Sequence, residues 1–181
     1  MKKILIGITG CIAAYKIIDL IRLLNKKGYE TKVILTRSGL DFVTEMTIKT
    51  ISTNSPYTDR YNLYSDNIKH IELSKWADLM LIAPATANTI AKIANGIADN
   101  LLSSTVLALP NKTKLLIAPA MNTRMWDKPI TQNNIKKLKK YYKKSRIINP
   151  RESLLACNEK GLGAMANIED IYKTIKKGLA K

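Results

Sequence analysis

The sequence predicts a single-domain α/β protein over residues 1–181, built on a three-layer, doubly wound parallel sheet of the Rossmann or flavodoxin-like kind. Four apolar runs alternate with segments of helical periodicity, which favours parallel strands joined by helices. The run at 3–9 is a continuous β-branched stretch, as in a strand that is buried on both faces. No linker, repeat or low-complexity tract divides the chain, and 181 residues suit one domain.

The first strand is expected at 3–9, where a continuous β-branched run lies close to the amino terminus. A helix is expected over 11–28, because its apolar residues recur at helical spacing and Gly28 is a suitable C-cap. The run at 31–36 then predicts the second strand.

A second helix is expected over 38–50, with Ser38 as its N-cap. The segment 52–67 is polar and rich in turn-forming residues, so we interpret it as an excursion outside the core. The third strand is predicted at 78–84, and a helix is expected to follow over 88–108.

The fourth strand is predicted at 114–119, and the lysine-rich segment 135–146 is expected to form an amphipathic helix. A short fifth strand is expected at 146–149 and a closing helix at 168–180. The apolar face of the lysine-rich helix is expected to comprise Ile135, Leu138, Tyr141 and Tyr142.

The chain is strongly basic, with 30 Lys and Arg against 14 Asp and Glu, a net charge of +16 and a pI near 9.8. Such a charge raises the question of a nucleic-acid or membrane partner. We interpret the lysines of 135–146 as a solvated helix face, since no RNA- or DNA-binding motif accompanies them, and we expect no nucleic-acid partner. The longest apolar stretch, 4–14, is too short to span a bilayer, so no membrane partner is expected and a cytoplasmic location is predicted.

The chain has two cysteines, Cys11 and Cys157, which cannot form a disulfide framework. No cluster of His and Cys has the spacing of a zinc site, so no metal is expected.

Ligands of open α/β sheets bind beyond the carboxyl ends of the strands, which directs attention to the loops at 9–14, 36–39, 83–89 and 118–126. The first of these loops holds a glycine turn before a helix, where an anion can bind to backbone N–H groups. It departs from the dinucleotide fingerprint, and the second strand ends without the acidic residue that holds an NAD ribose. A phosphate-bearing cofactor other than NAD is the better match.

The last two loops carry unusual polar residues. Thr86 and Asn88 stand at a helix start, where the local interpretation is an N-cap. Met121, Met125 and Trp126 suit the wall of an apolar pocket, and Asn122 among them is expected to meet a polar ligand. The alternative for Asn122 is a turn residue after the strand.

These loops resemble motifs of the homo-oligomeric flavin-containing cysteine decarboxylases. Residues 84–89 resemble the PASANT motif with Thr86 in place of its Ser, and 119–126 match the PxMNxxMW motif. Residues 10–16, GCIAAYK, are similar to the family's phosphate loop, with Cys in place of Ser. Residues 155–165, LACNEKGLGAM, resemble its substrate clamp, which is expected to be mobile around 151–167.

The resemblance implies FMN as the cofactor and trimers, sometimes four of them as a dodecamer, with FMN at the trimer interface. On this basis the residues expected to bind FMN are Gly10, Cys11, Ile12, Thr36, Ser38, Phe42, Thr86, Ala87, Asn88, Thr89 and Ala120. Those expected to bind the substrate are Met121, Asn122, Met125 and Ala156.

The resemblance also implies three catalytic residues. His70 stands where the family has its catalytic histidine, although a lone histidine is more often structural. Asn122 would orient the substrate carboxylate without a charge that opposes loss of CO2. Cys157 would donate a proton when the flavin reduces the enethiolate left by decarboxylation, whereas a free cysteine is otherwise often a small buried apolar residue.

Cys157 indicates the branch of the family that decarboxylates 4′-phosphopantothenoylcysteine to 4′-phosphopantetheine in coenzyme A biosynthesis. Ala164 replaces the clamp's usual Arg and Asn158 a clamp glycine, so the clamp's contacts are expected to differ. The alternatives are a peptidyl-cysteine decarboxylase or another flavin-dependent enzyme of the family. A non-catalytic flavin-binding regulatory subunit and a basic nucleic-acid-binding protein are further alternatives.

Overall fold

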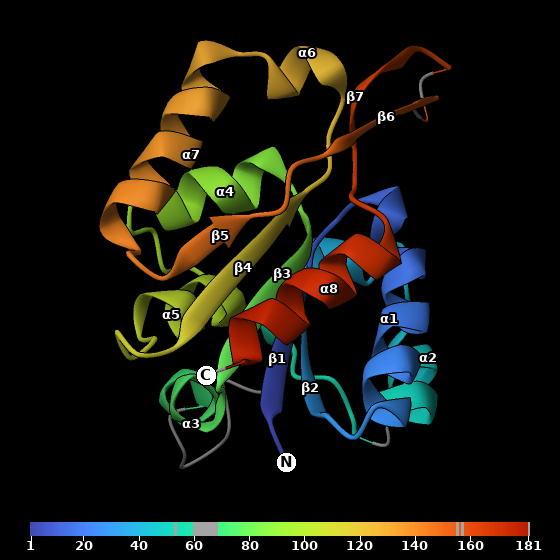
Figure 1. The fold of residues 1–181 in the computed structure, drawn as a ribbon, viewed down its shortest axis with the longest axis vertical. Helices are drawn as coiled ribbons and strands as arrows, with labels where there is room; N and C mark the ends of the chain where they lie inside the picture. Colours follow the sequence, from blue (N-terminus) through green and yellow to red (C-terminus); the bar gives the residue numbers. More distant parts are fainter. Residues whose placement is uncertain (53, 60–68, 155, 157, 181) are drawn as a thin grey trace.

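A five-stranded parallel sheet in the order β2-β1-β3-β4-β5 forms the centre of the computed structural model (Figure 1). The model describes residues 1–52, 54–59, 69–154, 156 and 158–180. Strand order reverses between β1 and β3, which in such folds marks the ligand-binding end. The strands are β1 Lys3–Ile8, β2 Glu30–Leu35, β3 Leu79–Ala85, β4 Lys114–Pro119 and β5 Ser145–Ile147. The predicted fold class and all five predicted strands are confirmed.

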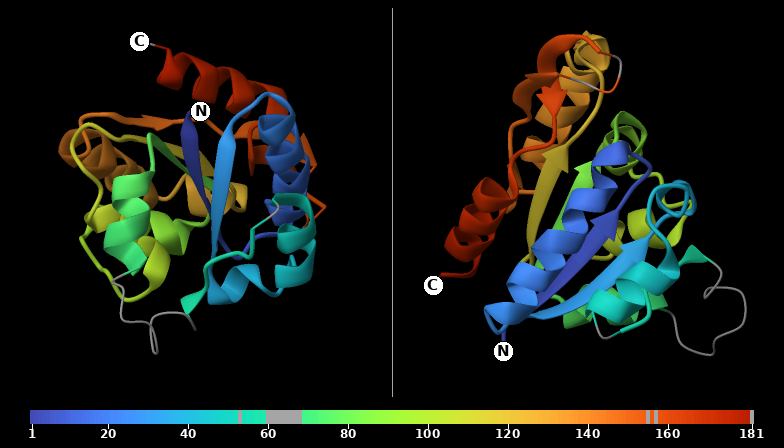
Figure 2. Two further views of the ribbon diagram at one scale, coloured as in Figure 1. Left: turned by 90° about the horizontal axis from the view of Figure 1, so that it is seen from below. Right: turned by 90° about the vertical axis from the view of Figure 1, so that its right-hand side faces the viewer.

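Helices cover both faces of the sheet, as Figure 2 shows from two sides. Successive residues of each strand contribute to opposite faces, so that Ile4 and Ile6 belong to one core cluster and Leu5 to the other. The helices of the first cluster are α1 Tyr15–Lys26, α2 Glu45–Ser52 and α8 Ile168–Leu179. Those of the second are α3 Lys69–Trp76, α4 Ala87–Ala94, α5 Leu101–Leu107 and α7 Pro129–Tyr141.

The helix expected over 38–50 is shorter than predicted. It begins only at Glu45, and a short 3-10 turn, η2 Arg37–Gly39, precedes it. The N-cap of that turn is Thr36, whose Oγ1 accepts a hydrogen bond from the Gly39 amide, rather than the predicted Ser38. The reason is packing, because the turn lies directly against the loop after β1.

The helix expected over 88–108 is two helices, α4 and α5. Gly96, with φ of 70°, follows the end of α4 in a left-handed conformation that stops a helix. Asn100 then starts α5 with a capping box, in which its side chain accepts from the Ser103 amide and the Ser103 side chain accepts from the Asn100 amide. Helical periodicity on both sides of this break concealed it.

The lysine-rich helix is displaced toward the amino terminus relative to the predicted 135–146. As α7, it begins with Pro129 at its first position and ends at Tyr141. Ile135 and Leu138 are buried as expected, but Tyr141 is 64% exposed and does not belong to the buried face.

A two-stranded antiparallel hairpin, β6 Arg151–Leu154 and β7 Lys160–Ala164, lies beyond the carboxyl end of the sheet (Figure 1). It occupies the segment that the sequence interpretation assigned to a clamp. The register shifts at Gly163, because Arg151 pairs with Ala164 while Glu152 pairs with Leu162. No helix in the described part of the chain is long and apolar enough to cross a membrane.

Candidate active site

A cavity of about 400 Å³ lies at the carboxyl ends of the strands. Its walls come from the segment after β1, the loop after β4 and the β6–β7 hairpin. The lining residues are Cys11, Ile12, Ala13, Tyr15, Lys16, Ala120, Met121, Asn122, Arg151, Ser153, Leu154, Ala156, Gly163, Ala164 and Met165. Three segments far apart in the sequence therefore build one site.

Part of the predicted site is brought together in this cavity. The predicted residues that line it are Cys11, Ile12, Ala120, Met121, Asn122 and Ala156. The predicted residues that are not among its lining are Gly10, Thr36, Ser38, Phe42, His70, Thr86, Ala87, Asn88, Thr89 and Met125. Cys157 lies outside the described residues.

The loops after β1 and β3 are joined by one buried hydroxyl. Thr9 Oγ1 donates a hydrogen bond to the Pro84 carbonyl oxygen at 2.6 Å and accepts one from the Thr86 amide at 3.2 Å. Because this hydroxyl of the loop after β1 bonds the end of β3 and the residue that follows β3, it fixes where α4 begins.

Thr86 is the N-cap of α4, which is the local interpretation that its sequence position favoured. Its Oγ1 accepts from the Thr89 amide at 3.3 Å and donates to Thr89 Oγ1 at 3.1 Å. Asn88 in the first turn of this helix is exposed.

The loops after β1 and β2 also pack closely. A Cβ added to Gly10 would come within 2.5 Å of Ser38 Cβ, so only glycine permits this approach. Thr36 Oγ1 additionally donates to the Ile8 carbonyl oxygen at 3.2 Å. The structure thus places three predicted cofactor residues, Gly10, Thr36 and Ser38, in one turn region beside the cavity.

Asn122 starts the short helix α6 Thr123–Trp126 as its N-cap, and its Oδ1 accepts from the Arg124 amide at 2.8 Å. The expectation that its amide depends on a ligand is therefore too strong, because the protein itself supplies a partner for the oxygen. Trp126 belongs to the core and Met125 is 48% exposed, so of the predicted apolar wall only Met121 lines the cavity.

The hairpin is held tightly against the loop after β4. The Met121 amide donates to the Gly163 carbonyl oxygen at 3.0 Å, and a Cβ on Gly163 would collide with the Met121 carbonyl oxygen. A Cβ on Gly161 would likewise collide with Thr123 Oγ1. The two glycines, which lie within the segment expected to form a mobile clamp, allow a close backbone approach in the structure.

The cavity holds two cations that the site prediction did not include. Lys16 comes from the first turn of α1, and Arg151 from β6. The motif at 10–16 contains Lys16, so a sequence signal for it existed. Arg151 had no such signal, because its place depends on a hairpin register that puts it opposite Ala164.

Cys11, which lines the cavity, is partly buried, and this burial raises the pKa of its thiol above the ordinary value. A hydrogen bond with the Ala13 backbone acts in the opposite direction and is the smaller effect. The neutral thiol is favoured at neutral pH, which agrees with packing or cofactor contact rather than nucleophilic chemistry.

His70 lies in the first turn of α3 and is half-buried. At the end of α3, Trp76 contacts the start of β1, where Lys3 Nζ lies 5.8 Å from the ring centroid. Figure 1 shows α3 at the end of the sheet where β1 and β3 begin, whereas the hairpin lies at the opposite end. Within one chain, His70 is therefore not brought to the cavity.

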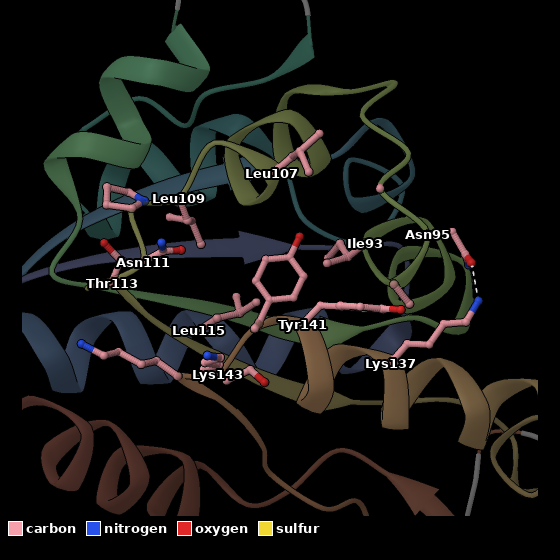
Figure 3. A pocket seen from close by; sticks show the side chains of 16 residues that line it. Ile93, Asn95, Leu107, Leu109, Asn111, Thr113, Leu115, Lys137, Tyr141 and Lys143 are labelled. Atoms are coloured by element: carbon pink, nitrogen blue, oxygen red, sulfur yellow. Dashed lines mark hydrogen bonds between the residues drawn. The ribbon is translucent and has the colours of Figure 1, made fainter.

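A second, larger cavity of about 760 Å³ lies between the carboxyl ends of α4, α5 and α7 (Figure 3). Tyr141, Tyr142 and several lysines line it, and Lys137 Nζ donates to Asn95 Oδ1 at 2.8 Å there. None of the predicted site residues that the structure describes borders this cavity. In the described part of the chain, no group of three or more His, Cys, Asp or Glu side chains is arranged to hold a metal ion.

The fold and the smaller cavity define a flavodoxin-like α/β protein whose ligand site lies beyond the strand ends. Residues 1–180 match the family model described as Flavoprotein, and the chain belongs to this family. The expected membership of a flavin-containing family is thereby confirmed.

Three proteins similar to this chain in sequence or structure indicate the kind of flavoprotein to which it is related. The chain is 44% identical over 182 residues to the probable phosphopantothenoylcysteine decarboxylase of Streptococcus mutans, covering 98% of this chain and 99% of that protein. A PPC decarboxylase mutant complexed with pantothenoylaminoethenethiol is 32% identical, with a TM-score of 0.87 and 97% of both chains covered. The FMN binding protein AtHal3 is also 32% identical, with a TM-score of 0.84 and coverage of 98% and 96%. Other relatives are bifunctional coenzyme A biosynthesis proteins, of which the chain spans less than half.

Proposed function

We propose that this protein is an FMN-dependent carboxy-lyase that converts 4′-phosphopantothenoylcysteine to 4′-phosphopantetheine in coenzyme A biosynthesis, and that it works in the cytoplasm. The observation that carries the proposal is the cavity at the strand ends, which joins the segment after β1, the loop after β4 and the hairpin. Its wall combines apolar residues, a neutral amide and two cations, which suits a substrate with a carboxylate, a phosphate and an apolar linker.

The residues present fit a bound FMN. Ile12, Ala13 and Ala120 provide apolar surface for a ring, and the turn around Gly10 abuts Ser38 beside them. We assign FMN binding to this region and to the loops of Thr36 and Thr86. The flavin supplies reversible two-electron redox chemistry at the substrate's cysteine moiety.

The chain's own residues bind the substrate and move its protons. Asn122 orients the carboxylate as a neutral hydrogen-bonding group, so it does not strongly stabilise the negative charge, which must pass to the remaining fragment when neutral CO2 leaves. We assign His70 the role of base and Cys157 that of proton donor, as the family resemblance implies. Met121 contributes an apolar wall that keeps water from the reacting carbon.

We infer that the working unit is a homo-oligomer, a trimer or a dodecamer of four trimers. Two features of one chain support assembly. His70 lies on an element remote from the cavity, so a second copy is the natural source of that side chain. Large apolar side chains are also exposed near the strand ends, among them Ile12, Phe42 and Met125.

The first test is the visible absorption spectrum of the purified protein, which should contain the flavin peaks. Release of CO2 from 4′-phosphopantothenoylcysteine should then be observed, with little or none from a peptide ending in cysteine. Preference for the peptide would favour the peptidyl-cysteine decarboxylase alternative. Bound flavin without turnover of either compound would favour a regulatory role.

The second test concerns the site. Asn122→Asp places a negative charge beside the carboxylate, and we expect turnover to fall by about 100-fold or more. His70→Asn should reduce it to a similar extent. Asn111→Asp is the matched control, because it makes the same charge change at an exposed position away from the cavity. Normal turnover in either site variant would refute that residue's assignment.

A further inference from the structure

Arg151 is a cationic residue in the wall of the candidate active site, and one of its N–H donors makes no hydrogen bond. It lines the cavity, and its Nε is buried without a hydrogen-bond partner. One terminal nitrogen, Nη1, contacts the Glu152 carbonyl oxygen at 3.4 Å, which is long for a charged donor. A buried donor without an acceptor costs about 1–3 kcal/mol, so a shift of the side chain that brings this donor to a ligand oxygen would recover the energy.

Lys16 approaches the same cavity from the opposite element, the first turn of α1. It is half-buried, and its Nζ lies 5.7 Å from the centroid of the Tyr15 ring, which is also part of the wall. Among the described residues that line the cavity, none is Asp or Glu. The two cations therefore create a positive potential that no lining carboxylate neutralises.

We propose that Arg151 and Lys16 form the phosphate-recognition site of this cavity and bind the phosphate monoester of the substrate. This inference rests on the proposed function. The substrate has two anionic groups, but its carboxylate loses its charge during the reaction. A cation on that group would stabilise the ground state more than the transition state and would slow decarboxylation. The phosphate keeps its charge throughout, so a fork of guanidinium donors on it strengthens binding without that penalty.

The hairpin geometry makes this role specific to the side chain at 151. Arg151 and Ala164 are partners across the two strands, and both line the cavity. Because Ala164 is small, its side chain occupies little of the space beside its cross-strand neighbour Arg151. The hairpin is fixed to the loop after β4 by the Met121–Gly163 hydrogen bond, so Arg151 has a defined distance from Asn122.

The test compares 4′-phosphopantothenoylcysteine with pantothenoylcysteine as substrates of the flavin-loaded enzyme. In Arg151→Ala we expect KM for the phosphorylated substrate to rise by about tenfold or more, with kcat within about twofold. KM for the dephosphorylated substrate should stay unchanged. Arg151→Lys should recover part of the loss, and Lys16→Ala should act in the same direction. Arg146→Ala is the matched control, since it removes the same charge from an exposed position.

Two outcomes would overturn the inference. One is an unchanged ratio of the two KM values in Arg151→Ala, which would show that the guanidinium does not distinguish phosphate. The other is weaker binding of FMN but not of riboflavin to Arg151→Ala, measured by quenching of flavin fluorescence, which would assign the pair to the cofactor's phosphate.

Failure of the proposed function would be seen separately, as the absence of turnover of both substrates by the unaltered enzyme. In that case, calorimetric titration of the protein with 4′-phosphopantothenoylcysteine still decides the inference. Binding that Arg151→Ala weakens and Arg146→Ala does not would support it, and equal binding by all three proteins would refute it.

Discussion

The Thr9 hydroxyl positions the backbone at the ends of two strands beside the site. It is 1% exposed, and it bonds with a carbonyl and an amide of the loop after β3, 75 and 77 residues away in sequence. Side-chain hydrogen bonds of Thr36, Thr86 and Asn122 similarly fix the loops after β2, β3 and β4. Individual polar residues at the strand ends therefore determine where the site's backbone lies.

Replacing Thr9 by Val should lower the free energy of unfolding by about 2 kcal/mol. The change keeps the shape of the side chain but leaves the Pro84 carbonyl oxygen and the Thr86 amide without their partner. Urea unfolding followed by circular dichroism would measure this loss.

Thr50→Val is the control for this prediction, because its hydroxyl donates to the Met46 carbonyl oxygen at an exposed position. We expect a change below about 0.5 kcal/mol there. Equal decreases in the free energy of unfolding of the two variants would show that the buried Thr9 hydrogen bonds stabilise the protein no more than an exposed one.

At the scale of elements, the β6–β7 hairpin is the piece that closes the site. Its glycines allow β7 to lie directly on the loop after β4, and Arg124 bonds Glu159 across the same junction at 2.8 Å. That ion pair is solvent-exposed and contributes little, so backbone packing does most of the fixing.

Gly163→Ala should separate the hairpin from this loop. The added Cβ would collide with the Met121 carbonyl oxygen, which is backbone and cannot rotate away. We expect a loss of about 1–3 kcal/mol in the free energy of unfolding, together with a higher KM as the wall carrying Arg151 shifts.

Gly178→Ala provides the comparison, since its Cβ would lie 3.1 Å from Leu79 Cδ1, the end of a side chain that can adjust. A helix also favours Ala over Gly, so the net change should stay within about 1 kcal/mol. A Gly163→Ala protein as stable as this control would contradict the close-packed hairpin.

At the scale of the whole molecule, we propose that part of the net charge of +16 attracts the anionic substrate. The two cavity cations lie within a generally positive surface, which attracts a substrate with two anionic groups. The lysines of α7 do not line this cavity, and one of them, Lys137, borders the second one.

Raising the ionic strength from about 0.05 to 0.5 M should increase KM for the phosphorylated substrate, because salt screens this attraction. The increase should be larger than for pantothenoylcysteine, which carries one anionic group fewer. Steady-state kinetics on both substrates would measure it, and kcat should change little. The same salt dependence for both would show that the surface charge does not act through the phosphate.

Much of the fold could be predicted because it depends on local patterns. Continuous apolar runs gave all five strands of the sheet, and helical periodicity gave α1, α7 and α8 with modest errors at their ends. The break between α4 and α5 was missed, since helical spacing continues on both sides of the Gly96 turn. The start of α2 was missed because packing against Gly10, not the propensity of Ser38, sets the turn before it.

The sequence by itself determined the fold class, the four loops at the strand ends and the family of flavin enzymes, because residue identity and spacing carry these directly. Only the tertiary structure decided which predicted residues share the cavity, that His70 lies away from it, and that Arg151 enters it. Those outcomes depend on cross-strand register and on packing between distant segments, which no local pattern encodes. Arg151 is the clearest case, since the position of its guanidinium follows from a pairing with Ala164 across a hairpin.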